Sequence, residues 1–404
     1  MIEAQVEKWL SSHLPDGLPL AVVLPSGRRI ASADAAAAPK VEMRLTSPLA
    51  LRHLIKPSLS SLGSAYVEGL IDVEGKVDDI VRMAVDLSRD SGAEFEDDEP
   101  GLLARLLAHS KRRDRAAIEY HYDVSNDFYR LFLDERMVYS CAYFRHETDT
   151  LDQAQENKLD HILNKLRVQP GERFLDVGSG WGALIVRAAQ RGAIATGVTL
   201  STQQYEHCQE LIARLGLADR CSVRLLDYRD IPATEQYEKI ASVGMFEHVG
   251  HRNLSAYFEK MQSLLAPGGA MLMHGITSTM PGRKQVGRGG GDFIDRYVFP
   301  DGELPHLSFV LEAMAGAGLE VVDVESLRRH YAATLAEWAR RFEAQADKAR
   351  ELAGDKRFRI WRVYLAGCSY GFAHNWMNIY QILACRLGSG NNPFPMTREW
   401  MYRE

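Results

Sequence analysis

The chain has 404 residues, of which 46% are hydrophobic and 25% are charged, and it carries a formal net charge of −6 at pH 7. This length predicts two domains, and the composition is typical of a globular protein rather than a disordered or fibrous one. The negative net charge argues against a nucleic-acid-binding protein, and no apolar stretch is long enough to predict a membrane-spanning helix.

The start of the chain lacks the basic segment and apolar core of a signal peptide, so we expect a cytoplasmic protein. The five cysteines are odd in number and contain no CxxC pair, which argues against a disulfide framework and against a structural metal site.

Residues 1–90 predict a small α+β domain. Leu18 to Leu24 is a short apolar run that ends at Pro25-Ser26-Gly27, as a strand followed by a turn does, and Val77 to Leu87 is apolar at helical spacing. Residues 91–115 predict an acidic linker and a helix with a basic end at Lys111, Arg112, Arg113 and Arg115. That end is either a solvated helix terminus or a contact with anionic lipid headgroups.

From Gly171 onward, short β-rich runs alternate with segments long enough for crossover helices, which predicts a doubly wound α/β sheet. The predicted strands are Arg173–Val177, Ala193–Leu200, Ser222–Leu226, Lys239–Val243, Ala270–Ile276 and Leu319–Val324. We expect helices from Leu335 to the end, including an aromatic-rich final helix that reaches Trp376 and Tyr380.

A glycine-rich turn follows the first of these strands, in the order Asp176, Gly178, Gly180 and Gly182. Glycines between a strand and a helix let the backbone and the free helix N–H groups approach a ligand closely. The second strand ends at Gly197–Ser201 without the acidic residue that a nicotinamide ribose requires. The pattern resembles the class I S-adenosylmethionine methyltransferases; the alternative is a structural turn in another α/β domain.

Longer motifs narrow this resemblance. They are His121 to Tyr129, Tyr139 to Phe144, Phe246 to Gly250, His274 to Ile276, and Phe293 to Pro300. Together they resemble the cyclopropane fatty acid synthases and the related mycolic acid cyclopropane synthases. The resemblance implies a catalytic domain over residues 116–404, with a Rossmann-like methyltransferase fold and helical additions. Leu62 to Gly69 also resembles the accessory, lipid-related domain of members that act on phospholipids.

The resemblance implies that a cis double bond of a phospholipid acyl chain takes a methylene from S-adenosylmethionine, through a carbocation deprotonated by bound bicarbonate. The implied bicarbonate site comprises Cys141, Glu247, His274, Ile276 and Tyr331, with Cys368 as a weak further catalytic candidate. The implied cofactor-binding residues are Tyr139, Ser140, Asp176, Gly178, Ser179, Gly180, Gly182, Thr199, Leu200, Ser201, Gln204, Asp227 and Tyr228.

Alternatives remain at this stage. Cys141 is equally explained as a core thiol, and we interpret Cys368 as a core thiol because the implied reaction needs no thiol nucleophile. The alternative for His274 is a satisfied histidine at a strand end, and the alternative for Glu247 is a helix cap. The product is either a cyclopropane or a methyl- or methylene-branched chain, and a lipid-binding protein without catalytic activity is a third hypothesis. Lys284 to Gly291 is either a mobile lid over the acyl chain or a variable surface loop. The resemblance also implies peripheral contact with the inner face of the membrane and a homodimer, with no nucleic-acid partner.

Overall fold

A computed structural model of the chain describes residues 19–32, 39–55, 57–88, 125–281, 290–299, 302–386 and 392–402. The acidic linker, the basic segment Lys111 to Arg115 and residues 284–289 of the glycine-rich loop lie outside these ranges. The chain forms two compact units. The smaller holds Met1–Pro100, Gln285–Pro300 and Leu335–His374, and the larger holds Gly101–Lys284, Asp301–Thr334 and Asn375–Glu404. The predicted boundaries at residues 90 and 115 fall among undescribed residues and stay predictions.

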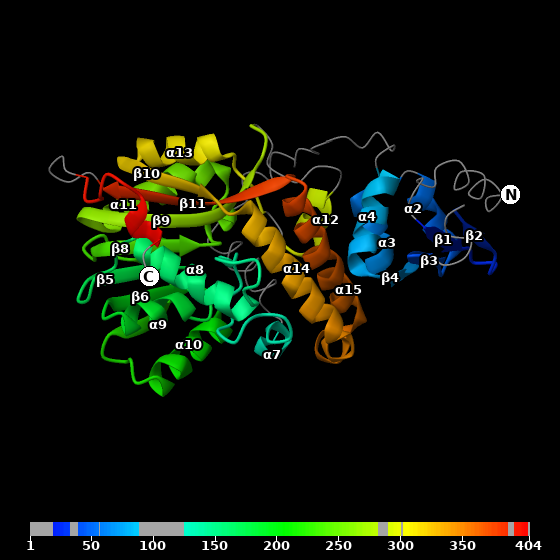
Figure 1. Ribbon diagram of the computed structural model, residues 1–404, viewed down its shortest axis with the longest axis horizontal. Helices are drawn as coiled ribbons and strands as arrows, with labels where there is room; N and C mark the ends of the chain where they lie inside the picture. Colours follow the sequence, from blue (N-terminus) through cyan, green and yellow to red (C-terminus); the bar gives the residue numbers. More distant parts are fainter. Residues whose placement is uncertain are drawn as a thin grey trace. The chain divides into compact units, whose positions relative to one another are not determined.

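The larger unit is built on a seven-stranded sheet in the order β10-β11-β9-β8-β5-β6-β7 (Figure 1). The strands from β9 to β7 run parallel, and β11 is antiparallel to both of its neighbours. Strand bounds are β5 Arg173–Val177, β6 Ile194–Thr199, β7 Cys221–Leu225, β8 Tyr237–Val243, β9 Leu265–Ser278, β10 Leu319–Ser326 and β11 Met377–Arg386.

Helices cover both faces of this sheet, and each face has its own hydrophobic core (Figure 1). One face carries α8 (Leu151–Lys165), α9 (Ala183–Gln190) and α10 (Thr202–Arg214); the other carries α11 (Leu254–Leu264) and α13 (Leu307–Gly316). Shorter elements are α7 Asn126–Tyr129, η3 Tyr228–Asp230, η4 Phe246–His248, η5 His251–Asn253 and η6 Glu399–Tyr402. The predicted doubly wound α/β sheet is therefore confirmed.

The expectation of helix up to the C-terminus was wrong for residues 377–386. The last helix, α15 (Ala346–Ala373), ends before Asn375, whose φ of 59° lies in the left-handed region. Strand β11 follows, and it lies between β9 and β10 with most of its side chains buried. Its partners in β9 lie about 100 to 115 residues earlier in the chain, and its partners in β10 lie about 55 to 65 residues earlier, so the nearby sequence gave no sign of them.

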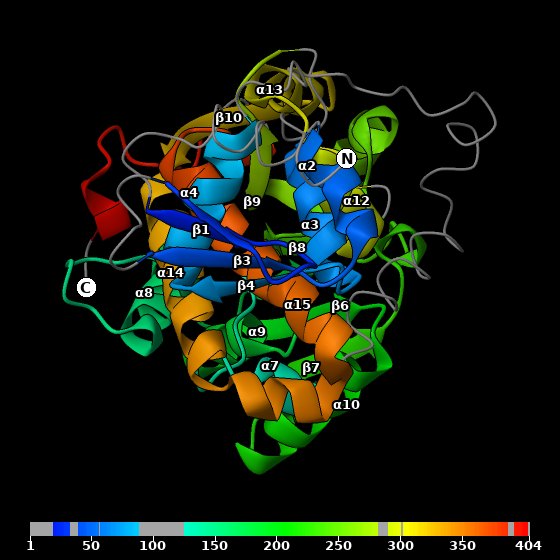
Figure 2. The same ribbon diagram turned by 90° about the vertical axis from the view of Figure 1, so that its right-hand side faces the viewer.

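The smaller unit contains a four-stranded sheet in the order β2-β1-β3-β4 (Figure 2). The strands are β1 Leu20–Val23, β2 Arg29–Ala31, β3 Val41–Leu45 and β4 Ile71–Gly75. The helices of this segment are η2 Pro48–Ala50, α2 Leu51–Ile55, α3 Leu59–Val67 and α4 Val77–Ser88. Side chains of β1, β3, α3 and α4 form one hydrophobic core, as expected for a small α+β domain.

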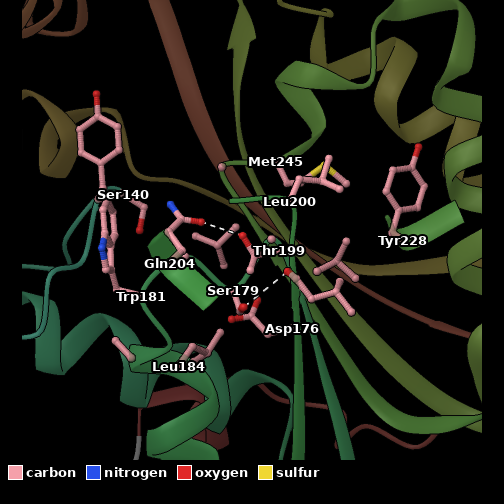
Figure 3. A pocket seen from close by; sticks show the side chains of 18 of the residues that line it. Ser140, Asp176, Ser179, Trp181, Leu184, Thr199, Leu200, Gln204, Tyr228 and Met245 are labelled. Carbon is pink, nitrogen blue, oxygen red and sulfur yellow. Dashed lines mark hydrogen bonds between the residues drawn. The ribbon is translucent and has the colours of Figure 1, made fainter. Parts of the chain in front are cut away.

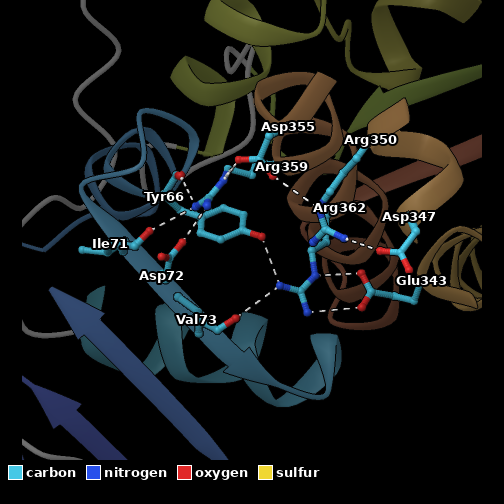
Figure 4. A network of polar contacts seen from close by, with 10 residues as sticks. All are labelled: Tyr66, Ile71, Asp72, Val73, Glu343, Asp347, Arg350, Asp355, Arg359 and Arg362. Atoms are coloured by element: carbon cyan, nitrogen blue, oxygen red, sulfur yellow. Dashed lines mark hydrogen bonds and ion pairs between the residues drawn. The ribbon is translucent and has the colours of Figure 1, made fainter. Parts of the chain in front are cut away.

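Later parts of the chain complete this unit: α12 (Gly290–Tyr297), the end of α14 (Arg328–Ala344) and α15. Two arginines of α15 bind the outer edge of β4 (Figure 4). Arg359 donates to the carbonyl of Ile71 and pairs with Asp72 at 2.6 Å, while Arg362 donates to the carbonyl of Val73 and pairs with Glu343 at 2.7 Å. These guanidinium groups satisfy carbonyls that an edge strand otherwise exposes. Among the described residues, no helix is long and apolar enough to cross a membrane.

Candidate active site

A cavity of about 150 Å³ opens at the carboxyl ends of β5, β6 and β8, where the strand order of the sheet reverses (Figure 3). Ligands of open α/β sheets bind at this position, because successive crossovers leave a crevice there. Eleven of the predicted cofactor-binding residues line it: Tyr139, Ser140, Asp176, Gly178, Ser179, Gly180, Thr199, Leu200, Gln204, Asp227 and Tyr228.

The glycine turn lies flat against β6. The amides of Gly178 and Ser179 both donate to the Val198 carbonyl at 3.0 Å. Gly182 has a φ of 91°, and a Cβ there would lie 2.8 Å from the sulfur of Cys208. Gly182 and Ser201 do not line the cavity; they start α9 and α10 as N-cap residues. Their contribution in this structure is to hold the two loops that form the cavity wall.

Asp176 brings a buried carboxyl group to the cavity. Its Oδ1 atom has no hydrogen-bond partner among the described residues. Burial raises the pKa of this group to about 7, and the nearby Lys158 ammonium only partly offsets that effect. A buried, unpartnered carboxyl group is costly unless a ligand donates to it.

Asp227 and Tyr228 are two of the implied cofactor-binding residues, and the structure shows them in different situations. The carboxylate of Asp227 is already engaged, since Oδ1 accepts from the amide and Nε of Arg229 at 2.9 Å and Oδ2 accepts from its terminal nitrogen at 2.6 Å. The ring of Tyr228 lines the cavity and packs edge-on against Tyr257. In this geometry the ring is better placed for a ligand contact than the carboxylate is.

Glu247, His274 and Ile276 come together at the end of β9. The Ile276 amide donates to Oε1 of Glu247 at 2.8 Å, so this amide orients the carboxyl group. The arrangement depends on Gly275, because a Cβ there would lie 1.7 Å from the ring of Phe246. Because Gly275 has no side chain, the Phe246 ring packs directly on the strand, and this packing positions Glu247, the next residue in the chain.

Two polar atoms of this cluster remain free. Glu247 Oε2 and His274 Nε2 are buried and have no partner among the residues that the structure describes. Burial raises the pKa of Glu247 to about 7 and lowers the pKa of His274 well below its usual 6.5, so the imidazole is neutral. His274 Nδ1 lies 3.4 Å from the Gln381 amide nitrogen; if it accepts there, the proton sits on Nε2. An N–H donor at His274 and a free carboxyl oxygen of Glu247, which is held at the Ile276 amide near the same end of β9, fit a small protonated oxyanion such as bicarbonate.

Cys141 and Tyr331 lie at the start of α14. The Cys141 thiol is fully buried and lies 3.8 Å from the Leu327 carbonyl, while the Ala142 amide donates to the hydroxyl of Thr334. Leu327 in turn donates to the carbonyl of Ile379, which pairs with Ile276. Cys141, Tyr331 and Ile276 are thus connected at one end of the sheet. Burial raises the pKa of the Cys141 thiol far above its usual value, which argues against a thiolate role.

Cys368 belongs to α15 of the smaller unit. Its side chain is buried, and burial raises the pKa of the thiol to about 12. A protonated, buried thiol is a poor nucleophile. This environment is the one expected of a thiol in the hydrophobic core.

Sequence reasoning missed the side chains of α8 that support the loop carrying Tyr139 to Cys141. Gln155 donates to the Ser140 carbonyl at 2.9 Å, and Lys158 donates to the Ser140 hydroxyl at 2.9 Å. One signal was present: Lys158 falls on the buried stripe of this helix, between apolar positions, where a charged residue needs a partner.

Comparison with known proteins identifies the family to which the chain belongs. The family model described as mycolic acid cyclopropane synthetase matches residues 109–382, and a domain of unknown function (DUF7884) matches residues 8–93. The chain is 46% identical to a probable fatty acid methyltransferase of Pseudomonas putida, covering 96% of this chain and 97% of the relative. It is 35% identical to the tuberculostearic acid methyltransferase UfaA1 of Mycobacterium tuberculosis, covering 92% and 88%. Among solved structures, mycolic acid cyclopropane synthase CmaA1 complexed with SAH and CTAB has a TM-score of 0.63 at 36% identity, covering 67% of this chain and 98% of that one.

Proposed function

Because the chain belongs to the mycolic acid cyclopropane synthetase family, we propose that it transfers a methylene from S-adenosylmethionine to the cis double bond of a phospholipid acyl chain. The product that we propose is a cyclopropane ring. The observation that carries this proposal is the pair of buried, unpartnered atoms Glu247 Oε2 and His274 Nε2.

The cavity at the ends of β5 and β6 is the proposed site of S-adenosylmethionine. Asp176 offers an acceptor for the ammonium group, and the glycine turn from Gly178 to Gly182 leaves room for the ligand near the start of α9. The ring of Tyr228 offers a face for the adenine. A solved relative complexed with SAH supports this assignment.

The proposed reaction requires a base but no protein nucleophile. The alkene carbon forms a bond to the sulfonium methyl carbon, the carbon–sulfur bond breaks, and S-adenosylhomocysteine leaves as a neutral thioether. The resulting cation loses a proton from the new methyl group, and the electron pair of that C–H bond closes the ring. Buried Cys141 and Cys368 thiols with raised pKa values are consistent with a reaction that uses no thiolate.

Bicarbonate would supply the base when bound, and the chain's own residues fit it. His274 Nε2 would donate to one oxygen, and Glu247 would accept the hydroxyl hydrogen and so fix which oxygen is basic. The Ile276 amide holds Glu247 in this orientation. We propose that the backbone of Cys141 and the hydroxyl group of Tyr331 complete the site. A fixed anion near a developing cation is an electrostatic contribution of the kind that dominates many enzyme reactions.

A second product is favoured by a specific observation. Two relatives that match nearly the whole chain carry methyltransferase names, one of them for tuberculostearic acid. A 1,2-hydride shift in the same cation moves the charge to the methyl-bearing carbon, and loss of a methyl proton then gives a methylene-branched chain. A saturated methyl branch requires a further step with a separate hydride donor. Fold, cofactor and acceptor class are the same for both products.

The decisive experiment is a lipid analysis of cells that express the wild-type chain or Glu247→Gln, in a host without such an enzyme. Gas chromatography–mass spectrometry detects acyl chains that are one CH₂ heavier, and NMR distinguishes high-field ring protons from vinylic methylene protons. Ring protons that disappear in the variant support cyclopropanation and the role of Glu247. A branched product moves the assignment to the second candidate. No new lipid, together with no cofactor binding in calorimetry, would favour a lipid-binding protein without catalytic activity.

The smaller unit is proposed to be an accessory unit that helps the enzyme reach lipid. A separate part of this proposal is peripheral membrane contact through Lys111 to Arg115, which belong to the larger unit. Reversing these charges should weaken sedimentation with anionic vesicles and leave cofactor affinity unchanged. Unchanged sedimentation would contradict it.

A further inference from the structure

Lys158 is a buried cation in the wall of the cavity. It projects from the middle of α8, its side chain is 2% exposed, and it lines the same cavity as Ser140 and Asp176. Its ammonium group has three N–H donors, and the structure gives it one hydrogen bond among the described residues, to the Ser140 hydroxyl at 2.9 Å. A buried ammonium with donors to spare is expensive unless a further acceptor binds to it.

Two buried carboxyl groups lie near Lys158. Asp134 does not line the cavity, and its oxygens accept from the Arg136 and Val138 amides, so Asp176 is the one that faces a ligand. Asp176 ends β5 and has an unpartnered Oδ1 atom, and it lies close enough to Lys158 for the two to influence each other's ionisation. No direct ion pair joins Lys158 to Asp176 among the described contacts, so each retains capacity for a ligand. A cavity with one buried cation and one buried carboxyl group is complementary to an α-amino acid zwitterion.

We propose that Lys158 binds the carboxylate of the amino-acid end of S-adenosylmethionine, with Ser140 beside it and Asp176 receiving the ammonium group. This inference rests on the proposed function and goes beyond it by assigning a recognition residue on α8. It explains why α8 holds the loop of Ser140 so firmly, since Gln155 fixes the backbone carbonyl of Ser140 while Lys158 fixes its hydroxyl. A ligand carboxylate would then meet a cation and a hydroxyl whose positions are set before binding.

A structural role for Lys158 makes a different prediction. If the lysine only held the loop, its loss would weaken every ligand of the cavity to a similar extent. If it binds the carboxylate, its loss weakens only ligands that carry one. The two roles separate when the same variant is measured with two ligands that differ only in that group.

The test uses the full-length chain and isothermal titration calorimetry with S-adenosylhomocysteine and its decarboxylated analogue, neither of which can be turned over. The wild-type protein should bind S-adenosylhomocysteine at least tenfold more tightly than the analogue. Lys158→Met should lose roughly ten- to a hundredfold in affinity for S-adenosylhomocysteine, the effect of one hydrogen bond between charged groups, and less than about threefold for the analogue.

Lys165→Met is the matched control, because Lys165 is another fully buried lysine of α8 but pairs with Asp323 and Glu325 and does not line the cavity. It should lower thermal stability without changing the ratio of the two affinities. If Lys158→Met melts too early to be titrated, Lys158→Gln replaces it, and the wild-type comparison stands independently.

Equal losses for both ligands in Lys158→Met, or a wild-type protein that binds both ligands equally, would overturn the assignment of Lys158. Failure of the wild-type protein to bind S-adenosylhomocysteine at all would instead overturn the proposed function.

Discussion

Replacing Glu247 with glutamine should stabilise the ligand-free protein at neutral and alkaline pH, although it should abolish the proposed activity. Burial raises the pKa of Glu247 from its ordinary 4.5 to about 7. Between these two values the folded chain keeps a proton that the unfolded chain has lost. The contribution to stability is therefore fully present below about pH 4.5 and is lost as the pH rises through 7.

The size of the effect follows from the two pKa values. A rise from 4.5 to about 7 corresponds to about 3.4 kcal/mol in the free energy of unfolding, at 1.36 kcal/mol for each pKa unit. Of this total, about 2.5 kcal/mol falls between pH 5 and pH 8. Glutamine keeps an oxygen for the Ile276 amide and has no proton to lose, so it avoids this penalty.

The assay is urea unfolding of both proteins at pH 5, 6, 7 and 8 in bicarbonate-free buffer. The stability of Glu247→Gln minus that of the wild-type protein should grow by about 2.5 kcal/mol across this range. Asp176, whose pKa is also raised to about 7, is present in both proteins and cancels in the difference. Glu147→Gln, at an exposed position of the same unit, should give a curve parallel to that of the wild type. Parallel curves for Glu247→Gln as well would refute the reasoning.

Three further predictions concern other parts of the molecule. Gly275→Ala should cost at least about 2 kcal/mol in unfolding experiments and reduce activity more than tenfold, since its Cβ would overlap an aromatic ring; wild-type stability and activity would refute this. Cys368→Ala should retain activity within about threefold while losing about 1 kcal/mol of stability, and an inactive but folded variant would restore a catalytic thiol. The affinity for S-adenosylhomocysteine, measured by calorimetry against pH, should be greatest between about pH 7 and 8, because Asp176 ionises above about 7 and Lys158 loses its proton above about 8. Affinity that is flat from pH 6 to 9 would contradict that assignment.

The strands of the larger unit could be predicted where a short stretch of sequence is enough to specify them. Strands such as Arg173–Val177 and Lys239–Val243 are short apolar runs followed by helix-length segments, and the structure has both. Strand β11 was not predictable in this way, because its sequence is a short apolar run without strict alternation. Such a run is compatible with helix or strand, and only its pairing with β9 and β10 decides between them.

The residues of the candidate site also fall into those that the sequence indicated and those that it did not. The glycine turn and the residues near Glu247 form contiguous motifs, so the sequence located them. Lys158 was missed because its partner Ser140 precedes it by 18 residues and belongs to an irregular loop. The engagement of Asp227 by Arg229, by contrast, is local: an aspartate commonly accepts from the amide two residues later, so this contact was within reach of the sequence.

Burial in the free site shifts the pKa values of its polar groups away from the charge states that their proposed work requires, and this has a consequence for binding. Burial pushes Asp176 and Glu247 toward the protonated form and Lys158 toward the neutral amine. A ligand ammonium beside Asp176 would reverse its shift, and a ligand carboxylate beside Lys158 would do the same. Binding of S-adenosylhomocysteine should therefore release protons near pH 6.5 and take them up near pH 8.5. Calorimetry in buffers of different ionisation enthalpy measures this exchange directly. An exchange of the same sign at both pH values would mean that only one of the two groups meets the ligand.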